Sequence, residues 1–136
     1  MKRVGGLYDA VWQWDTLRAA FHKARKGARC SREALAFEAR LDENLRQLQD
    51  ELKAQQVRLA GFTQFIIHDP KERTITAPAF RDRVLHHAIM QVCEPHFDRW
   101  LIADSYACRK GKGRLAALER ATHFAKQHGW YLKLDI

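Results

Sequence analysis

The feature of this sequence that most constrains its fold is a row of large apolar residues in the first half of the chain, spaced by four, four, three and four positions. The row comprises Phe37, Leu41, Leu45, Leu48 and Leu52. This spacing places the side chains on one face of an α-helix, which other apolar residues must cover to exclude water. We therefore expect a helix that begins after Ser31, a residue type that favours helix starts, and that packs on a shared core.

Two further helical patterns offer partners for this face. Residues 16–26 place apolar side chains on one side of a helix, with Asp15 as the expected N-cap and Gly27 at the C-terminal stop. A second pattern starts at about Phe80. Pro95 is expected to end or kink that helix, because proline cannot donate the helical hydrogen bond.

The remaining segments indicate strands and one more helix. Residues 62–67 and 73–77 are rich in β-forming residues on either side of a turn, which predicts an antiparallel hairpin that Pro78 ends. Residues 114–128 again show helical spacing. The segment 130–136, Trp-Tyr-Leu-Lys-Leu-Asp-Ile, is expected to form a buried strand. The predicted fold class is α+β.

Composition limits the setting in which such a fold works. The 136 residues are 46% hydrophobic, with no apolar run long enough to cross a bilayer. Because no apolar segment follows the N-terminal charges, we expect no secretory signal. The cysteines are too few and too scattered for a disulfide framework. They are Cys30, Cys93 and Cys108. We expect reduced thiols, a cytoplasmic protein and no membrane partner.

Positive charge is concentrated in two places. The net charge is +8, and residues 18–32 carry six Lys and Arg without an acid. Residues 109–114 carry four more, together with Gly111 and Gly113, whose lack of a side chain lets a ligand approach the backbone. A small domain this basic often binds a polyanion, while a solvated basic turn is the alternative for the second block.

Three segments carry candidate chemistry, each with a simpler alternative. Residues 70–84 place cations on the hairpin and on the start of the next helix, where they could bind a triphosphate or form surface ion pairs. Residues 104–113 set a tyrosine beside the basic glycine loop, which suits nucleic acid. Asp135 emerges from an apolar strand, where it could bind Mg²⁺ or begin a turn.

In this order, the segments resemble motifs of the reverse transcriptase family. Residues 80–88, Phe-Arg-Asp-Arg-Val-Leu-His-His-Ala, are similar to the family's fingers motif. Residues 104–109, Asp-Ser-Tyr-Ala-Cys-Arg, resemble its second motif, and residues 132–136, Leu-Lys-Leu-Asp-Ile, resemble the start of motif A. The likeness is greatest to bacterial enzymes of diversity-generating retroelements, group II introns and retrons, and it extends over nearly the whole chain.

The resemblance implies the fingers subdomain of a right-hand polymerase together with its first palm strand. Residues 1–60 would be N-terminal helices, 61–129 the fingers hairpin and helices, and 130–136 the palm strand. The implied activity is RNA-directed DNA synthesis. Because the family's Tyr-x-Asp-Asp box does not occur in these residues, we expect a partial domain that is inactive alone.

The resemblance also assigns roles to single residues. Asp135 would be the catalytic ligand of two Mg²⁺ ions, and the Ile136 carbonyl would help to bind the metal and the nucleotide. Arg73, with Lys71 beside it, would contact the incoming triphosphate. Arg83 would contact the same phosphates or the template.

The second motif implies contacts to nucleic acid. Tyr106 would stack on a base, while Arg109, Lys110 and Lys112 would contact the template backbone. The expected partners are an RNA template, a DNA primer, deoxynucleoside triphosphates and an accessory protein encoded by the same element. The family's usual Arg-Pro-Gly reads Arg-Lys-Gly at 109–111. The alternative is a non-catalytic RNA-binding module derived from polymerase fingers.

Overall fold

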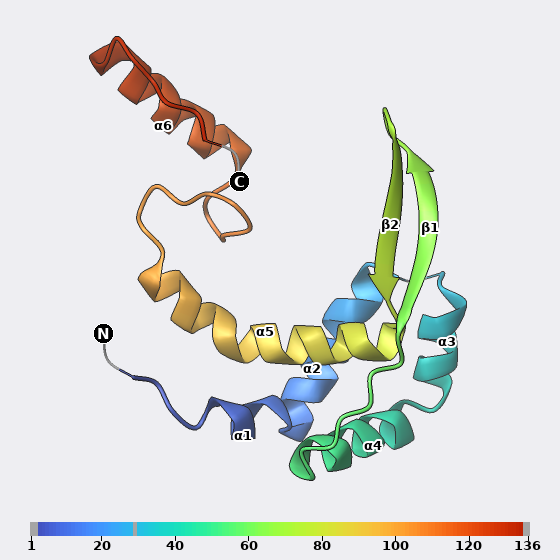
Figure 1. Ribbon diagram of the computed structural model, residues 1–136. Coiled ribbons are helices and arrows are strands. Elements are labelled where there is room, and N and C mark those ends of the chain that lie inside the picture. The colour runs from blue at the N-terminus through green and yellow to red at the C-terminus, as the bar shows by residue number, and fades with distance from the viewer. Residues whose placement is uncertain (1–2, 29, 135–136) are drawn as a thin grey trace. The chain divides into compact units, whose positions relative to one another are not determined.

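A computed structural model describes residues 3–28 and 30–134, which divide into two compact units at Pro95 and His96. We describe each unit by itself. The elements are α1 (Leu7–Val11), α2 (Trp14–Lys26), α3 (Arg32–Ala39), α4 (Leu41–Lys53), β1 (Phe62–His68), β2 (Glu72–Pro78), α5 (Phe80–Trp100) and α6 (Arg114–Gln127) (Figure 1). The described residues therefore combine six helices with one two-stranded sheet, which confirms the α+β class.

The long apolar row forms two helices where the sequence predicts one. The chain leaves helical geometry at Arg40, with φ −127° and ψ 44°, and this residue separates α3 from α4. The Asn44 side chain donates to the Phe37 carbonyl at 2.9 Å and satisfies an acceptor near the end of α3. The break changes the direction of the chain, so that Phe37 and Leu45 enter the core from separate helices.

Helix α2 follows the predicted pattern apart from its first turn. Its N-cap is Gln13, and Asp15 lies within the first turn, so the expected Asp15 cap is wrong. Asp15 still lies near the positive end of the helix dipole, where a carboxylate is favourable. Gly27 is the C-cap, as predicted.

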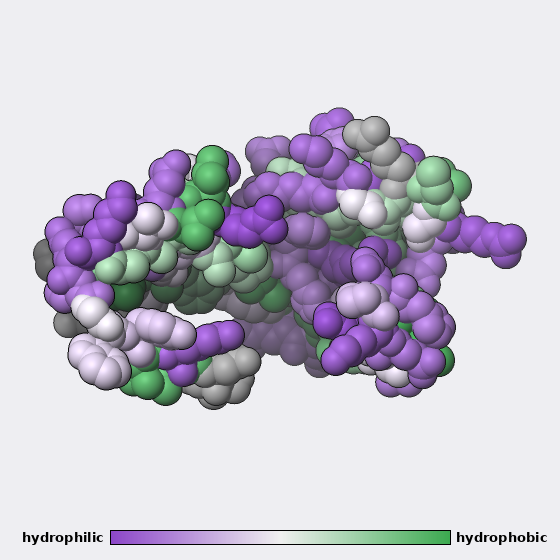
Figure 2. All heavy atoms as spheres, turned by 90° about the horizontal axis from the view of Figure 1, so that it is seen from above, coloured by the Kyte–Doolittle hydropathy of each residue, from purple (hydrophilic) through white to green (hydrophobic). Residues whose placement is uncertain are grey.

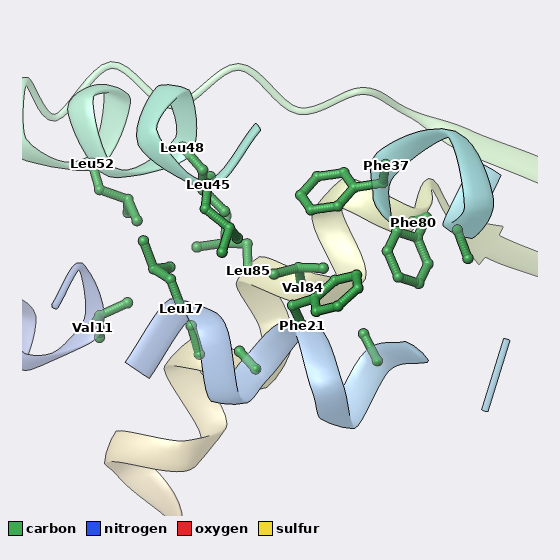
Figure 3. Close-up of a cluster of buried hydrophobic side chains, with 14 of the residues drawn as sticks. Val11, Leu17, Phe21, Phe37, Leu45, Leu48, Leu52, Phe80, Val84 and Leu85 are labelled. Atoms are coloured by element: carbon green, nitrogen blue, oxygen red, sulfur yellow. The ribbon is translucent and has the colours of Figure 1, made fainter. Parts of the chain in front are cut away.

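The core of the first unit is formed by side chains from α1 to α5 (Figure 3). Leu17, Leu45, Leu48 and Val84 are fully buried. Beside them lies a cluster of phenylalanine rings in stacked and edge-on contact, with centroid distances of 5.5–6.2 Å. Its members are Phe21, Phe37 and Phe80. Three helices therefore meet at one aromatic cluster.

Hydrogen bonds fix the first turn of α5 against the other elements. Glu33 on α3 accepts the Phe80 backbone N–H at 2.9 Å, and buried Asp82 accepts the Ala60 N–H at 2.9 Å. Each carboxylate accepts from a backbone N–H that has no partner in a helix or strand. Both hydrogen bonds join segments that are far apart in the sequence. The start of α5 is thereby held to α3 and to the segment that enters the hairpin.

Arg81 adds an ion pair at the same place. Its guanidinium donates to Glu51 at 2.6 Å and to the Arg58 carbonyl at 2.7 Å. Glu51 also accepts the Arg58 N–H at 3.1 Å. Desolvation alone would raise the pKa of Glu51, but these hydrogen bonds, the charge of Arg81 and the Gln47 amide outweigh it and hold the pKa below its ordinary value.

The hairpin matches the prediction. β1 and β2 pair antiparallel from Phe62 opposite Pro78 to His68 opposite Glu72. The ribbon extends from the first turn of α5, and its outer end projects past the helices of this unit (Figure 1). The Ala79 N–H donates to the Gly61 carbonyl at 3.0 Å, which closes the base of the ribbon.

The second half of the chain differs from the sequence-based expectations at two places. Of the two alternatives for Pro95, an end or a kink of the helix, the end is wrong, because α5 continues through Pro95. The single hydrogen bond that proline removes is one of many in this 21-residue helix. The described part of the expected strand, residues 130–134, has no regular secondary structure, and Trp130 is 94% exposed. A strand requires a hydrogen-bonded neighbour, and both described strands pair with each other.

The surface is mixed in character. Figure 2 shows hydrophilic side chains over much of one face, with hydrophobic side chains among them. Among residues 3–28 and 30–134, no helix is long and apolar enough to cross a membrane.

The core analysis predicts a large cost for truncating Leu48. Replacing this fully buried side chain with alanine should lower the free energy of unfolding by about 2–5 kcal/mol, because a cavity remains. Urea denaturation followed by circular dichroism measures the loss. Leu35→Ala is the matched control, since Leu35 is 49% exposed and should change stability little. Equal effects of the two substitutions would contradict the described core.

The ion pair at the start of α5 predicts a pH-dependent effect of Glu51→Gln. The variant should lose about 1–3 kcal/mol at neutral pH, because the charged hydrogen bonds to Arg81 and Arg58 weaken. The folded pKa of Glu51 lies below 4.5, so its contribution is complete above that pH and disappears as the pH falls through the folded value. The urea midpoints of wild type and variant should therefore converge in acid. Glu43→Gln, which removes an exposed pair with Arg40, should show neither effect.

Candidate nucleic-acid interface

The hairpin presents the two cations that the sequence assigns to a triphosphate. Lys71 lies in the turn between the strands, and Arg73 lies on β2 opposite Ile67. Both side chains are exposed, and neither makes an ion pair or hydrogen bond with the described residues. Their full donor capacity is therefore available to a ligand.

Arg83 lies near the base of the hairpin, in the first turns of α5. Its guanidinium carbon is 5.3 Å from the centroid of the Phe80 ring, a cation–π distance. Its Nε atom is buried and has no hydrogen-bond partner among the described residues. A buried donor without an acceptor is costly, so this atom marks a place where an acceptor would be favourable.

Arg109 has a different environment from that of the hairpin cations. Its guanidinium donates to the Asp98 carboxylate at 3.0 Å, to the carbonyls of Ile102 and Ser105 at 3.0 and 3.1 Å, and to the Asp98 carbonyl at 3.4 Å. These bonds occupy most of its five N–H donors. The geometry therefore favours Arg109 as the residue that positions this loop, while its predicted template contact stays a prediction.

The predicted stacking residue is also held within the loop. The Tyr106 hydroxyl donates to Asp104 at 3.2 Å, and the Lys112 ammonium lies 4.7 Å from the ring centroid. Lys112 also donates to the Ala103 carbonyl. One face of the tyrosine ring is therefore covered by a cation, and only the remaining surface of the ring could stack on a base.

Asp104 is the acceptor that joins this loop to α6. Arg120 donates to its two carboxylate oxygens at 2.9 and 3.3 Å. The hydrogen bond from Arg120 is the main cause that lowers the pKa of Asp104. Desolvation and the hydrogen bond to Asp104 raise the pKa of Tyr106. Asp104 therefore stays ionised and Tyr106 neutral at physiological pH.

Lys110 is the predicted template contact that stays available. It is exposed and makes no hydrogen bond or ion pair with the described residues. The turn around it uses left-handed backbone at Cys108, with φ +55°, and at Gly111, with φ +71°. This conformation favours glycine at position 111 and turns the chain tightly, so that Lys110 is presented between two fixed positions.

The residues assigned to metal lie elsewhere in the chain. Asp135 and Ile136 are outside the described residues. Within residues 3–28 and 30–134, no group of three or more His, Cys, Asp or Glu side chains is placed to hold a metal ion. The magnesium assignment therefore rests on the motif alone.

Sequence reasoning missed the residues that hold these sites in place. Glu33 and Glu51 appear in the sequence as ordinary acids of amphipathic helices, and Asp98 as one acid near an apolar segment. Their partners lie 47, 30 and 11 residues away, respectively. A signal existed only for Asp82, which lies between two arginines in the fingers motif.

Comparison with known proteins identifies no family for this chain. No protein-family model matches the chain, and no curated protein matches it. Membership of the reverse transcriptase family stays a prediction from the three sequence motifs.

The arrangement around Arg109 predicts that its shape matters more than its charge. Arg109→Lys keeps the positive charge but loses most of the hydrogen bonds to Asp98 and to the loop carbonyls. Amide hydrogen exchange in residues 101–113 should become about tenfold faster, since the lost bonds are worth at least about 1.4 kcal/mol. Lys110→Ala is the control and should leave exchange unchanged. Normal protection in the Arg109→Lys protein would show that the guanidinium does not position the loop.

Proposed function

We propose that this chain forms the fingers part of an RNA-directed DNA polymerase, in which it binds single-stranded RNA and the incoming deoxynucleoside triphosphate. The observation that carries the proposal is the hairpin with Lys71 and Arg73 at its outer half. Both cations are exposed and unpaired among the described residues. Unpaired cations on a projecting ribbon suit a polyanionic ligand, because phosphate oxygens accept from Lys and Arg.

The RNA contact is assigned to the loop that contains Lys110. In this proposal Arg109, Lys112 and Arg120 hold the loop through their hydrogen bonds to Asp98, Asp104 and the loop carbonyls, and Lys110 donates to a backbone phosphate. The exposed part of the Tyr106 ring offers a surface for a base. Internal cations thus position the loop, and the exposed cation supplies affinity.

Catalysis belongs to the complete polymerase. The proposal assigns Asp135 and the Ile136 carbonyl to two Mg²⁺ ions, which supply charge that stabilises phosphoryl transfer when bound. Support for this assignment comes from the Leu-Lys-Leu-Asp-Ile motif. A non-catalytic RNA-binding module is the second candidate, since the same basic loop would serve it; triphosphate binding distinguishes the two.

The proposal predicts two separable binding defects. Arg73→Gln should weaken binding of fluorescent dTTP by about tenfold or more, because a charged hydrogen bond to phosphate is lost. Lys110→Gln should instead reduce the salt dependence of RNA binding by about 0.7 in the slope of log K against log salt, the value for one phosphate contact. Fluorescence anisotropy measures both.

Arg46→Gln is the charge-matched control and should change neither the affinity for dTTP nor the salt dependence of RNA binding. RNA binding without any triphosphate binding would favour the non-catalytic module. Absence of both would contradict the proposal.

A further inference from the structure

A pocket of about 350 Å³ lies at the base of the hairpin, between the start of α3 and the first turns of α5. Its polar lining includes Ser31, Arg32, Thr63 and Arg83. Phe65 and neighbouring hairpin residues form an apolar wall. Two arginines and two hydroxyls therefore surround one small space.

Three polar groups of this lining have donor capacity left. The Ser31 hydroxyl makes no capping hydrogen bond to α3. Arg32 is exposed and has no partner among the described residues. Arg83 lines the pocket, and its side chain makes no hydrogen bond or ion pair with the described residues, so the terminal N–H groups of its guanidinium keep their donor capacity. An acceptor-rich anion of small size would satisfy all three.

One acid also lines the pocket, and its role is already fixed. Glu33 accepts the Phe80 backbone N–H at 2.9 Å, so its carboxylate acts as a structural acceptor at the start of α5. The two arginines still outnumber it, and the lining keeps a net positive charge.

A neighbouring histidine is consistent with positive charge near Arg83. Desolvation first, and then the positive charges of Lys23, His86 and Arg83, lower the pKa of His87.

The ribbon face that contributes Thr63 and Phe65 to the pocket also carries Arg73. Side chains directly opposite in an antiparallel pair share a face, so Thr63, Phe65 and Ile67 lie on the same face as Arg73. Arg73 is four residues along β2 from Ala77 at the pocket, a distance of about 13 Å. This face therefore carries the basic pocket, then the Phe65 ring, which is 48% exposed, and then Arg73.

We infer that the pocket of Ser31, Arg32, Thr63 and Arg83 binds a phosphate group, with a nucleotide base against Phe65. The inference rests on the proposed function for the choice of ligand. It deepens that function by adding a phosphate contact that involves neither the Lys110 loop nor the outer hairpin cations. A backbone phosphate of single-stranded RNA and a phosphate of a nucleoside triphosphate share this chemistry.

The test uses the whole chain with two probes, a labelled oligouridylate of about 10 nucleotides and labelled dTTP. Arg32→Gln and Arg83→Gln should each flatten the salt dependence of oligouridylate binding by about 0.7, and the double variant by about 1.4, if the phosphate is that of RNA. Thermal melts accompany each variant. Arg32→Gln keeps the test valid if Arg83→Gln fails to fold, because Arg32 is exposed. Arg46→Gln, which carries the same charge change outside this pocket, should leave both probes unaffected.

The two sources give different results. A flattened salt slope for oligouridylate supports a backbone phosphate, and a weakened affinity for dTTP alone supports a triphosphate. Unchanged binding of both probes by folded Arg32→Gln overturns the inference, even where Lys110→Gln and Arg73→Gln behave as the proposed function requires. If the wild-type chain binds neither probe, the proposed function fails and the inference fails with it.

Discussion

The burial of Phe80 against Phe21 and Phe37 is the contact on which the first unit depends. Each ring comes from a different helix, so the cluster joins α2, α3 and α5 at one point. The polar contacts of the same turn follow from this packing. Once Phe80 is buried, its backbone N–H needs an acceptor, which Glu33 supplies, and the adjacent Arg81 reaches Glu51 on α4. Apolar burial thus brings the helices together, and directional hydrogen bonds fix how α5 begins.

Periodicity predicted the elements whose stability comes from one apolar face. Helical spacing placed the buried side chains of α2 and of the leucine row correctly. The hairpin was predictable from β-forming residues on either side of a turn, and the strand pairing confirms it. Periodicity did not predict the break at Arg40, because the apolar spacing continues across it. The described part of the expected strand, residues 130–134, does not form a strand for a related reason: the apolar pattern identifies residues able to join a sheet, but pairing needs a neighbouring strand. Trp130 and Leu132 illustrate this, since both are apolar and both are largely exposed.

Charge was easier to count from the sequence than to interpret. Arg109, Lys110 and Lys112 look alike as members of one basic block, and all three were assigned to the template. The fold separates them, since Arg109 and Lys112 donate to groups of their own loop and Lys110 does not. Which cation donates within the loop depends on the positions of Asp98 and of the loop carbonyls. These positions follow from the backbone geometry and not from the composition. The basic block was therefore predictable as a region, while the division of roles within it depends on how the loop folds.

The hairpin connects the core to the proposed ligand contacts. A two-stranded ribbon is only marginally stable alone, and this one is held to the unit at its base, where the Ala79 N–H meets the Gly61 carbonyl beside Phe80. Its outer half therefore depends on pairing between two strands, with Phe65 and Ile66 about half exposed. A ligand that contacts Arg73 near the tip and Arg83 at the base would cross the least supported part of the ribbon and stabilise it. Binding would then stabilise the paired ribbon, because a ligand that prefers the paired form shifts the equilibrium toward it.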